Sequence, residues 1–280
     1  MSWRSCAKID AMRVLAHLSD LHFGRVDEAL VGSLQAVLAR LRPHLVVVTG
    51  DLTQRARSAQ FRSARAFLDA LPARYLVVPG NHDVPLYDIG RRLLRPLARY
   101  RRYIGDDVEP LYVDEEVAVA GVNTARSLTV KGGRINAEQL ARIRERFGTL
   151  PPHTVRVVAT HHPFDVPRGQ DVRQIVGRAA MAMEALSRCG VDICLAGHAH
   201  VAHVPQAASR YAVAGHGALL VQAGTATSTR ARGEANSFNV LHIERPEIRV
   251  EHHAWSPERR AFQCIASARF RQTADGWYPA

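Results

Sequence analysis

Polar side chains that could do chemistry follow a short apolar segment of this 280-residue chain. Tyr75-Leu76-Val77-Val78 leads into Gly80-Asn81-His82-Asp83, where an amide, an imidazole and a carboxylate stand in consecutive positions. A short apolar run of this kind is typical of a buried strand, and α/β proteins place their chemistry in the loops at the carboxyl ends of strands. The side chains favour a metal site. The alternative is a simple turn in which the Asn or Asp bonds its own backbone.

Two further pairs of residues have the spacing of metal ligands. Asp20 and His22 are separated by one residue, as are His198 and His200, and each pair follows an apolar segment. In extended backbone, residues two apart point to the same side, so Asp20 and His22 can reach one ion together.

Asp51 and His161 complete the set. Asp51 follows the apolar run 45–48 and Gly50, while His161 follows the run 155–159. The combined donors are carboxylates, an amide oxygen and imidazoles, without cysteine, which is the chemistry of manganese, iron or zinc and differs from a structural zinc site. Two ions ~3.5–4 Å apart and bridged by one carboxylate would use all these donors.

Alternating strands and helices are predicted to position these residues. Apolar residues at helical spacing predict helices, and β-branched runs predict strands buried on both faces. Strand–helix repeats roughly thirty residues apart indicate βαβ units with parallel strands. The predicted strands are 14–18, 45–48, 75–78, 111–113, 117–122, 155–159 and 191–196, and the predicted helices are 29–41, 58–71, 136–147 and 179–189.

The alternation stops near residue 211. Segments 211–214, 218–223, 237–244, 248–255 and 261–271 read as strands joined by short polar turns, and we predict that they continue the sheet in antiparallel fashion. Residues 84–110, with an Arg-rich helical stretch at 89–103, predict a small helical cap beside the site. Its arginines form either a solvated face or a binding surface. We expect residues 1–11 to be disordered and residues 12–275 to form a single domain.

Composition limits the class of protein. Hydrophobic residues make up 47% and charged residues 22%, which is typical of a globular chain. The net charge of +11 suits an anionic substrate, or weak association with nucleic acid or an anionic membrane. Four cysteines without a Cys-x-x-Cys pair favour a reducing compartment. Without an apolar run of roughly twenty residues or a signal-peptide core, we expect a cytoplasmic location. The oligomeric state stays open, with a homodimer as one alternative.

In combination and order, the motifs resemble those of the calcineurin-like metallophosphoesterases. The resemblance implies a four-layer α/β/β/α sandwich of two mixed sheets, with a dimetal site at the strand ends. By the same resemblance, the first ion would be held by Asp20, His22, Asp51 and His200, and the second by Asp51, Asn81, His161 and His198. The matching motifs are Asp20-x-His22, Gly50-Asp51, Gly80-Asn81-His82-Asp83, His161 and Gly197-His198-x-His200.

Within the family, two motifs look like those of class III cyclic-nucleotide phosphodiesterases and bacterial glycerophosphodiesterases. These are Gly50-Asp51-Leu52-Thr53 and His161-His162-Pro163. The sequence departs from them at Gln54, where an acidic residue is usual, and at Phe164, where a second proline is usual. The resemblance implies a phosphodiesterase with two divalent ions, manganese or iron, with zinc as the alternative.

The substrate implied is a small anionic diester such as a 3',5'-cyclic nucleotide. A glycerophosphodiester, a nucleotide-lipid pyrophosphate or nucleic acid would suit the same chemistry, and an inactive metal-binding module is the alternative from another class. A hydroxide that bridges the two ions would attack the phosphorus, and the resemblance assigns His82, oriented by Asp83, to protonate the leaving alkoxide. Candidate substrate-binding residues are Asn123 and His162 at strand ends and Arg230 and Arg232 in the polar loop 224–233.

Overall fold

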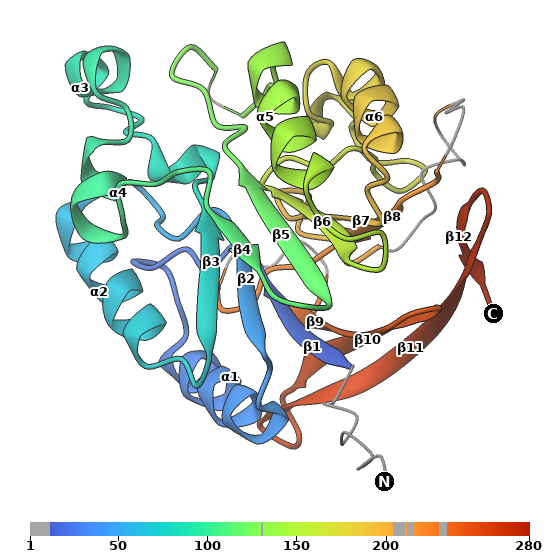
Figure 1. The fold of residues 1–280 in the computed structure, drawn as a ribbon. Helices are drawn as coiled ribbons and strands as arrows, with labels where there is room; N and C mark the ends of the chain where they lie inside the picture. The colour runs from blue at the N-terminus through green and yellow to red at the C-terminus, as the bar shows by residue number, and fades with distance from the viewer. Residues whose placement is uncertain (1–11, 130, 204–210, 212–215, 230–233) are drawn as a thin grey trace, which may run out of the picture.

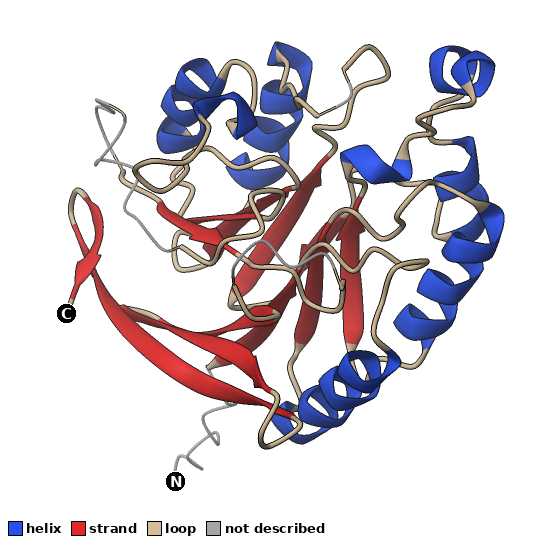
Figure 2. Cartoon of the chain, turned by 180° about the vertical axis from the view of Figure 1, so that it is seen from behind, coloured by secondary structure: helices blue, strands red, loops and turns tan. Residues whose placement is uncertain are grey.

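The computed structural model describes residues 12–129, 131–203, 211, 216–229 and 234–280. The segment 1–11, most of the predicted strand 211–214, and both Arg230 and Arg232 lie outside these described residues. Two mixed sheets pack face to face, and helices cover their outer faces (Figure 1). The view from behind shows the same arrangement, with helices on both outer sides of the strands (Figure 2). The predicted four-layer α/β/β/α sandwich is therefore confirmed.

The seven-stranded sheet has the order β12-β11-β10-β9-β1-β2-β3. β1, β2 and β3 run parallel, with Ala16 opposite Val46 and Val46 opposite Tyr75. β9 pairs antiparallel with β1, and β10 to β12 continue outward as antiparallel neighbours. The bounds are β1 Arg13–Leu18, β2 Leu45–Thr49, β3 Arg74–Val78, β9 Ser237–Glu244, β10 Glu247–Ser256, β11 Ala261–Thr273 and β12 Gly276–Pro279.

The five-stranded sheet has the order β4-β5-β6-β7-β8, and its last four strands are parallel. The predicted antiparallel direction is wrong for β8, which pairs parallel with β7. A short hairpin joins antiparallel strands, whereas parallel neighbours such as β7 and β8 need a longer crossover connection. The bounds are β4 Leu111–Val113, β5 Val117–Val122, β6 Val155–Thr160, β7 Ile193–Ala196 and β8 Leu219–Gln222.

Helices flank both sheets. α1 (Glu28–Leu41), α2 (Ser58–Asp69) and α4 (Ala98–Tyr103) contribute to the core on the outer face of the seven-stranded sheet, while α5 (Ala137–Gly148) and α6 (Ala179–Arg188) cover the five-stranded sheet. Asn136 caps α5: its side chain accepts a hydrogen bond from the Gln139 backbone N–H, and the Gln139 side chain accepts one from the Asn136 N–H.

The cap segment contains two short helices where one stretch was predicted. α3 spans Ile89–Leu94, and α4 begins only at Ala98. Pro96 lies between them; it lacks an N–H and disfavours helical backbone at Arg95, so the helix ends there.

Aliphatic side chains form the layer between the two sheets. Leu15, Val47 and Val78 of one sheet belong to the same buried cluster as Val119 and Val157 of the other. The central strands are buried on both faces, by this layer on one side and by helices on the other. They are therefore continuous apolar runs, and their polar residues fall at the ends. None of the described helices is long and apolar enough to cross a bilayer.

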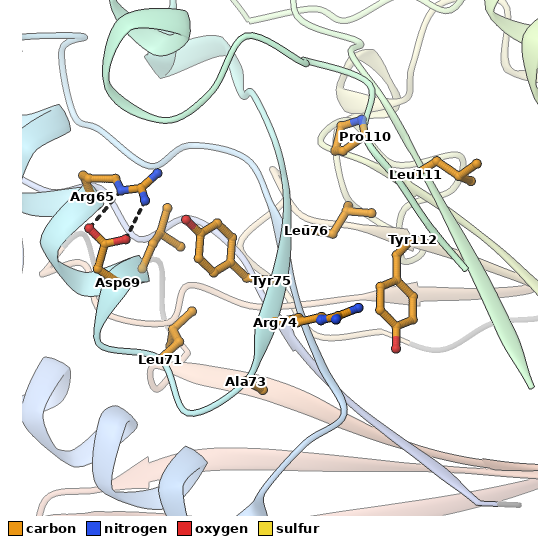
Figure 3. Close-up of a pocket in the computed structure, with 11 residues that line it drawn as sticks. Arg65, Asp69, Leu71, Ala73, Arg74, Tyr75, Leu76, Pro110, Leu111 and Tyr112 are labelled. Carbon is orange, nitrogen blue, oxygen red and sulfur yellow. Dashed lines mark hydrogen bonds and ion pairs between the residues drawn. The ribbon is translucent and has the colours of Figure 1, made fainter. Parts of the chain in front are cut away.

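A surface cavity of about 550 Å³ lies beside the start of β3 (Figure 3). Arg65 and Asp69 of α2 form an ion pair at its wall, and Tyr75 and Tyr112 also line it. The candidate ligands follow the opposite, carboxyl end of β3, so this cavity is separate from them.

Candidate metal centre

The structure brings the seven candidate ligands together at the carboxyl ends of five parallel strands. β1 is followed by Asp20 and His22, β2 by Asp51 and β3 by Asn81, while β6 and β7 of the other sheet are followed by His161 and by His198 with His200. The centre therefore lies where the ends of the two sheets meet, which is a usual place for α/β sites.

Asp20, His22 and His200 form the first group. The Nε2 atoms of His22 and His200 are each 3.5 Å from Asp20 Oδ1, and the two rings stack with centroids 5.5 Å apart. Asp20 Oδ2 accepts hydrogen bonds from Ser19 Oγ at 2.7 Å and from the His198 N–H at 3.0 Å. Oδ1 is buried and has no hydrogen-bond partner among the described residues. A carboxylate oxygen left in this way fits a cation.

Asp51, Asn81, His161 and His198 form the second group. His161 Nε2 is 3.4 Å from Asp51 Oδ1, 3.1 Å from Asn81 Oδ1 and 3.3 Å from His198 Nδ1. Its Nδ1 lies 2.7 Å from the Thr49 carbonyl oxygen. Because a carbonyl only accepts, Nδ1 carries the proton and Nε2 keeps its lone pair for a metal.

Asp51 lies between the two groups. Its Oδ1 faces His161, and its Oδ2 is 3.7 Å from His22 Nε2 in the first group. A carboxylate with one oxygen on each side is suited to bridge two ions. The donor set and its arrangement therefore fit the two divalent ions that the sequence predicts.

The electrostatics keep the donors in metal-binding forms. Burial opposes ionisation of Asp20, but the neighbouring imidazoles, His200 first, hold its pKa well below the usual value. Burial lowers the pKa of His198 to about 3. An ionised carboxylate and a neutral imidazole are the forms that bind metal.

Five of the candidate ligands have strained backbones. Their φ angles lie between 52° and 68°, in the left-handed region that non-glycine residues rarely occupy. Such strain costs on the order of 1–3 kcal/mol per residue and gathers at functional sites. The five residues are Asp20, His22, Asp51, His198 and His200.

Two glycines permit the close approach of the loops. A Cβ atom at Gly80 would collide with the Asp51 carboxylate, and one at Gly197 would collide with Ser19 Oγ. The glycines that precede Asn81 and His198 are therefore required by packing.

His82 lies at the edge of the centre. Its ring meets that of His22 edge to face, with centroids 4.9 Å apart, and its Nδ1 lies 2.9 Å from the Gln54 carbonyl oxygen. Since this contact uses the backbone of residue 54, the departure from the family pattern at Gln54 leaves it intact.

Asp83, which the resemblance assigns to orient His82, makes its hydrogen bonds to other groups. Asp83 is fully buried, and its oxygens accept hydrogen bonds from the backbone N–H groups of Gly80, Leu52 and Thr53. The Thr53 hydroxyl also donates to it. With its oxygens engaged in this way, Asp83 ties the loop after β3 to the loop after β2.

A cavity of about 600 Å³ opens above the centre. Its floor includes Asp51, Asn81, His82, His198 and His200. The walls carry four cationic side chains, and only Arg92 belongs to the Arg-rich stretch 89–103 that the sequence predicts beside the site. The wall residues are Gln54, Arg55, Val84, Leu86, Arg92, Lys131, Gly132, Asp171, Arg173 and Gln174.

The structure does not place Asn123 and His162 on the cavity wall. Asn123 Oδ1 accepts a hydrogen bond from the Ala125 N–H within its own loop. His162 is fully buried; its Nδ1 is 2.8 Å from Thr124 Oγ1, and its Nε2 is 3.0 Å from the Lys131 carbonyl oxygen. Local backbone and loop partners hold Asn123 Oδ1 and both His162 ring nitrogens, and a contact of either residue with substrate stays a prediction.

Arg55, Lys131 and Arg173 were missed as cavity residues. Lys131 had a usable signal, since it is one of two lysines in an Arg-rich chain and precedes the flexible pair Gly132-Gly133. Arg55 directly continues the Gly50 motif. Arg173 belongs to a short turn, and no pattern in the sequence distinguishes it from the other arginines.

Several known proteins that are similar to this chain are named as phosphodiesterases. The 3',5'-cyclic adenosine monophosphate phosphodiesterase CpdA of Escherichia coli K12 is 29% identical over 170 residues, which cover 55% of this chain and 56% of CpdA. A cAMP/cGMP dual specificity phosphodiesterase of Mycobacterium tuberculosis is 28% identical over 82% of this chain and 76% of that protein. The glycerophosphodiester phosphodiesterase GpdQ of Enterobacter lignolyticus is 33% identical over 38% of this chain and 44% of GpdQ.

Solved structures share the fold at low identity. A purple acid phosphatase from yellow lupin superposes with a TM-score of 0.71 and 12% identity, covering 92% of this chain and 53% of that one. A dimetal phosphatase from Danio rerio gives 0.65 and 14%, covering 91% and 98%. A profile of calcineurin-like phosphoesterases matches residues 13–202, which include every candidate ligand. The chain therefore belongs to the calcineurin-like phosphoesterase family.

Proposed function

We propose that this chain is a dimetal phosphodiesterase whose substrate is a small diester, a 3',5'-cyclic nucleotide. The observation that carries the proposal is the position of Asp51, which lies between two groups of donors on the floor of a cavity with cationic walls. The names of the relatives from Escherichia coli and Mycobacterium tuberculosis support the substrate class.

Each group of donors would hold one ion, with Asp51 shared. Oxygen and imidazole donors suit manganese or iron, with zinc as the alternative. When bound, the ions supply charge neutralisation for the phosphodiester and activation of a water as nucleophile. The first ion would use Asp20, His22, Asp51 and His200, and the second Asp51, Asn81, His161 and His198.

We assign proton transfer to His82. Because its Nδ1 faces the Gln54 carbonyl, Nδ1 holds a proton, and the protonated ring carries a second one on Nε2. An alkoxide leaving group needs such a donor, and a positioned imidazole typically contributes 10²–10⁴-fold to the rate.

The cavity suits a small anion. A volume of about 600 Å³ falls within the usual range of small-molecule sites. Arg55 and Lys131 on the wall provide positive charge for the phosphodiester and for polar groups of its organic part. Val84 and Leu86 add an apolar surface against which a base or ribose can pack.

A panel of diesters tests the proposal. The protein, reconstituted with manganese, is assayed with bis-p-nitrophenyl phosphate, cAMP, cGMP, glycerophosphocholine, a nucleotide-lipid pyrophosphate and single-stranded DNA. We expect the highest kcat/KM with a cyclic nucleotide. A preference for glycerophosphocholine would favour the second candidate function, a glycerophosphodiesterase, which the similarity to GpdQ supports. Failure to cleave any diester with two ions bound would overturn the proposal.

A further inference from the structure

A β-bulge places a cysteine opposite a histidine far along the sequence from the dimetal centre. The register between β10 and β11 shifts by one residue between His252 and His253, and Ile265 is the extra residue of β11. His253 consequently pairs with Cys264, whereas an unbroken ladder would pair Cys264 with Ala254. Since paired residues share a face and the faces alternate along a strand, the bulge brings Cys264 to the same face as His253.

Glu251 joins this pair. It precedes His253 by two residues on β10 and so shares its face. One potential ligand atom from each of Glu251, His253 and Cys264 lies within 4.8 Å of the others. His253 Nε2 is 3.1 Å from Glu251 Oε2, and His242 Nε2 is 3.4 Å from Glu251 Oε1.

The histidines leave buried nitrogen atoms unused. The His253 side chain is only 8% exposed, and its Nδ1 has no hydrogen-bond partner in the described part of the chain. The Nδ1 atom of His242 is also buried and has no hydrogen-bond partner among the described residues. A buried imidazole nitrogen without a partner is costly unless something binds it, and His253 lies in the group with the thiol and the carboxylate.

We propose that Glu251, His253 and Cys264 form a zinc site. Thiolate, imidazole and carboxylate are the donors of tetrahedral zinc sites, and the thiolate distinguishes this set from the oxygen and nitrogen donors of the dimetal centre. The bound ion would cross-link β10 and β11 where the bulge interrupts their ladder.

Two groups compete with zinc for these ligands. The Arg249 guanidinium pairs with Glu251 Oε1 at 2.7 Å, but its side chain is 40% exposed and is able to turn into water. The Cys264 thiol must lose its proton to bind zinc, because the thiolate is the ligand form. Affinity should consequently rise with pH and rise when Arg249 is removed.

Cobalt titration of the full chain tests the site. Cobalt bound by a thiolate gives a sulfur-to-metal charge-transfer absorption, which the donors of the dimetal centre do not produce. We expect this band in the wild type, its displacement by zinc, and its loss in Cys264→Ser. His253→Gln should weaken cobalt binding by at least about 10-fold, and Arg249→Gln should strengthen it.

Two controls separate this site from other thiols and from the catalytic centre. Cys189→Ser alters a half-buried cysteine on another element and should keep the band. Asp51→Asn, which disturbs the dimetal centre, should keep it too. The absence of the band in the wild type, or its persistence in Cys264→Ser, would overturn the zinc site and leave the phosphodiesterase proposal untouched.

Discussion

Asp51 and His82 are neighbours at the centre, but their contacts differ. The His82 backbone N–H donates to Asp51 Oδ1 at 2.8 Å, while the His82 ring is held by the Gln54 carbonyl and faces the cavity. Asp51 places one oxygen in each group of donors. We infer that Asp51 holds the ions and that His82 handles protons.

Substitution of the two residues should separate these roles. Asp51→Asn should lose both bound metal and activity, since an amide is a weak bridging ligand. His82→Ala should keep two ions while kcat falls by roughly 10²–10⁴-fold. The fall should be smaller with bis-p-nitrophenyl phosphate, whose leaving group needs little protonation. Elemental analysis measures the metal, and an empty centre in His82→Ala would contradict the assignment.

At the scale of elements, Arg92 connects the cap to the cavity. It is nearly buried on α3, and its guanidinium donates to the carbonyl oxygens of Ser127 at 2.7 Å, of Pro85 at 2.9 Å and of Thr129. The loop that it holds continues to Lys131 on the cavity wall. Arg92 therefore ties the segment at Pro85 to the loop at 127–129, and both segments lead to the cavity wall.

We predict that Arg92→Ala raises KM for the preferred diester by about tenfold, or roughly 1.4 kcal/mol, without changing metal content. Arg92→Lys should recover only part of the loss, because one ammonium group cannot match the planar fork that reaches three carbonyls. Arg91→Ala is the matched control, since Arg91 forms an exposed ion pair with Asp88 on the same helix. Equal KM changes in the Arg91 and Arg92 variants would refute this role.

At the scale of the whole molecule, Asp192 joins the two sheets. It lies just before β7 of the five-stranded sheet. It accepts hydrogen bonds from Arg245 at 2.7 Å, in the turn between β9 and β10, and from Trp277 Nε1 at 2.8 Å, in β12 of the seven-stranded sheet. His216 and the Arg156 N–H also donate to it. Burial works to raise the pKa of Asp192, but His216, Arg245 and the N–H donors outweigh it and hold the pKa below the usual value.

Asp192→Asn should lower the free energy of unfolding at neutral pH by about 3–5 kcal/mol, the usual cost of breaking a buried ion pair. Because the folded-state pKa is depressed, the contribution is present above the unfolded pKa of about 3.9 and is lost as pH falls through the folded pKa. Urea unfolding should therefore show the gap between wild type and variant closing below about pH 4. The exposed Asp69→Asn is the control; a gap that is independent of pH would argue against this linkage.

The N-terminal segment stays a prediction. Residues 1–11 lie outside the described residues, and their sequence has neither helical nor strand periodicity. We expect deletion of residues 1–11 to leave the melting temperature and the turnover essentially unchanged. Thermal unfolding and the diester assay measure both, and a large loss in either would show that this segment contributes to the fold or the site.

Local patterns in the sequence determined most of the architecture and the set of seven candidate ligands. Strand-end position is a local property, so Asp20, His22, His198 and His200 could be recognised as candidate ligands without a structure. Apolar runs predicted strands buried on both faces for the same reason, while the division of the strands into two sheets was implied by the family resemblance.

The tertiary structure alone decided where the remaining polar groups point. Asp83 faces backbone N–H groups of another loop, and His162 lies behind the centre against Lys131, because loops distant in sequence supply their partners. The direction of β8 depended on the path of a crossover that periodicity does not encode. Cys264 meets His253 through a shift of one residue, and such a shift exchanges the faces of a strand without leaving a mark in its hydrophobic pattern.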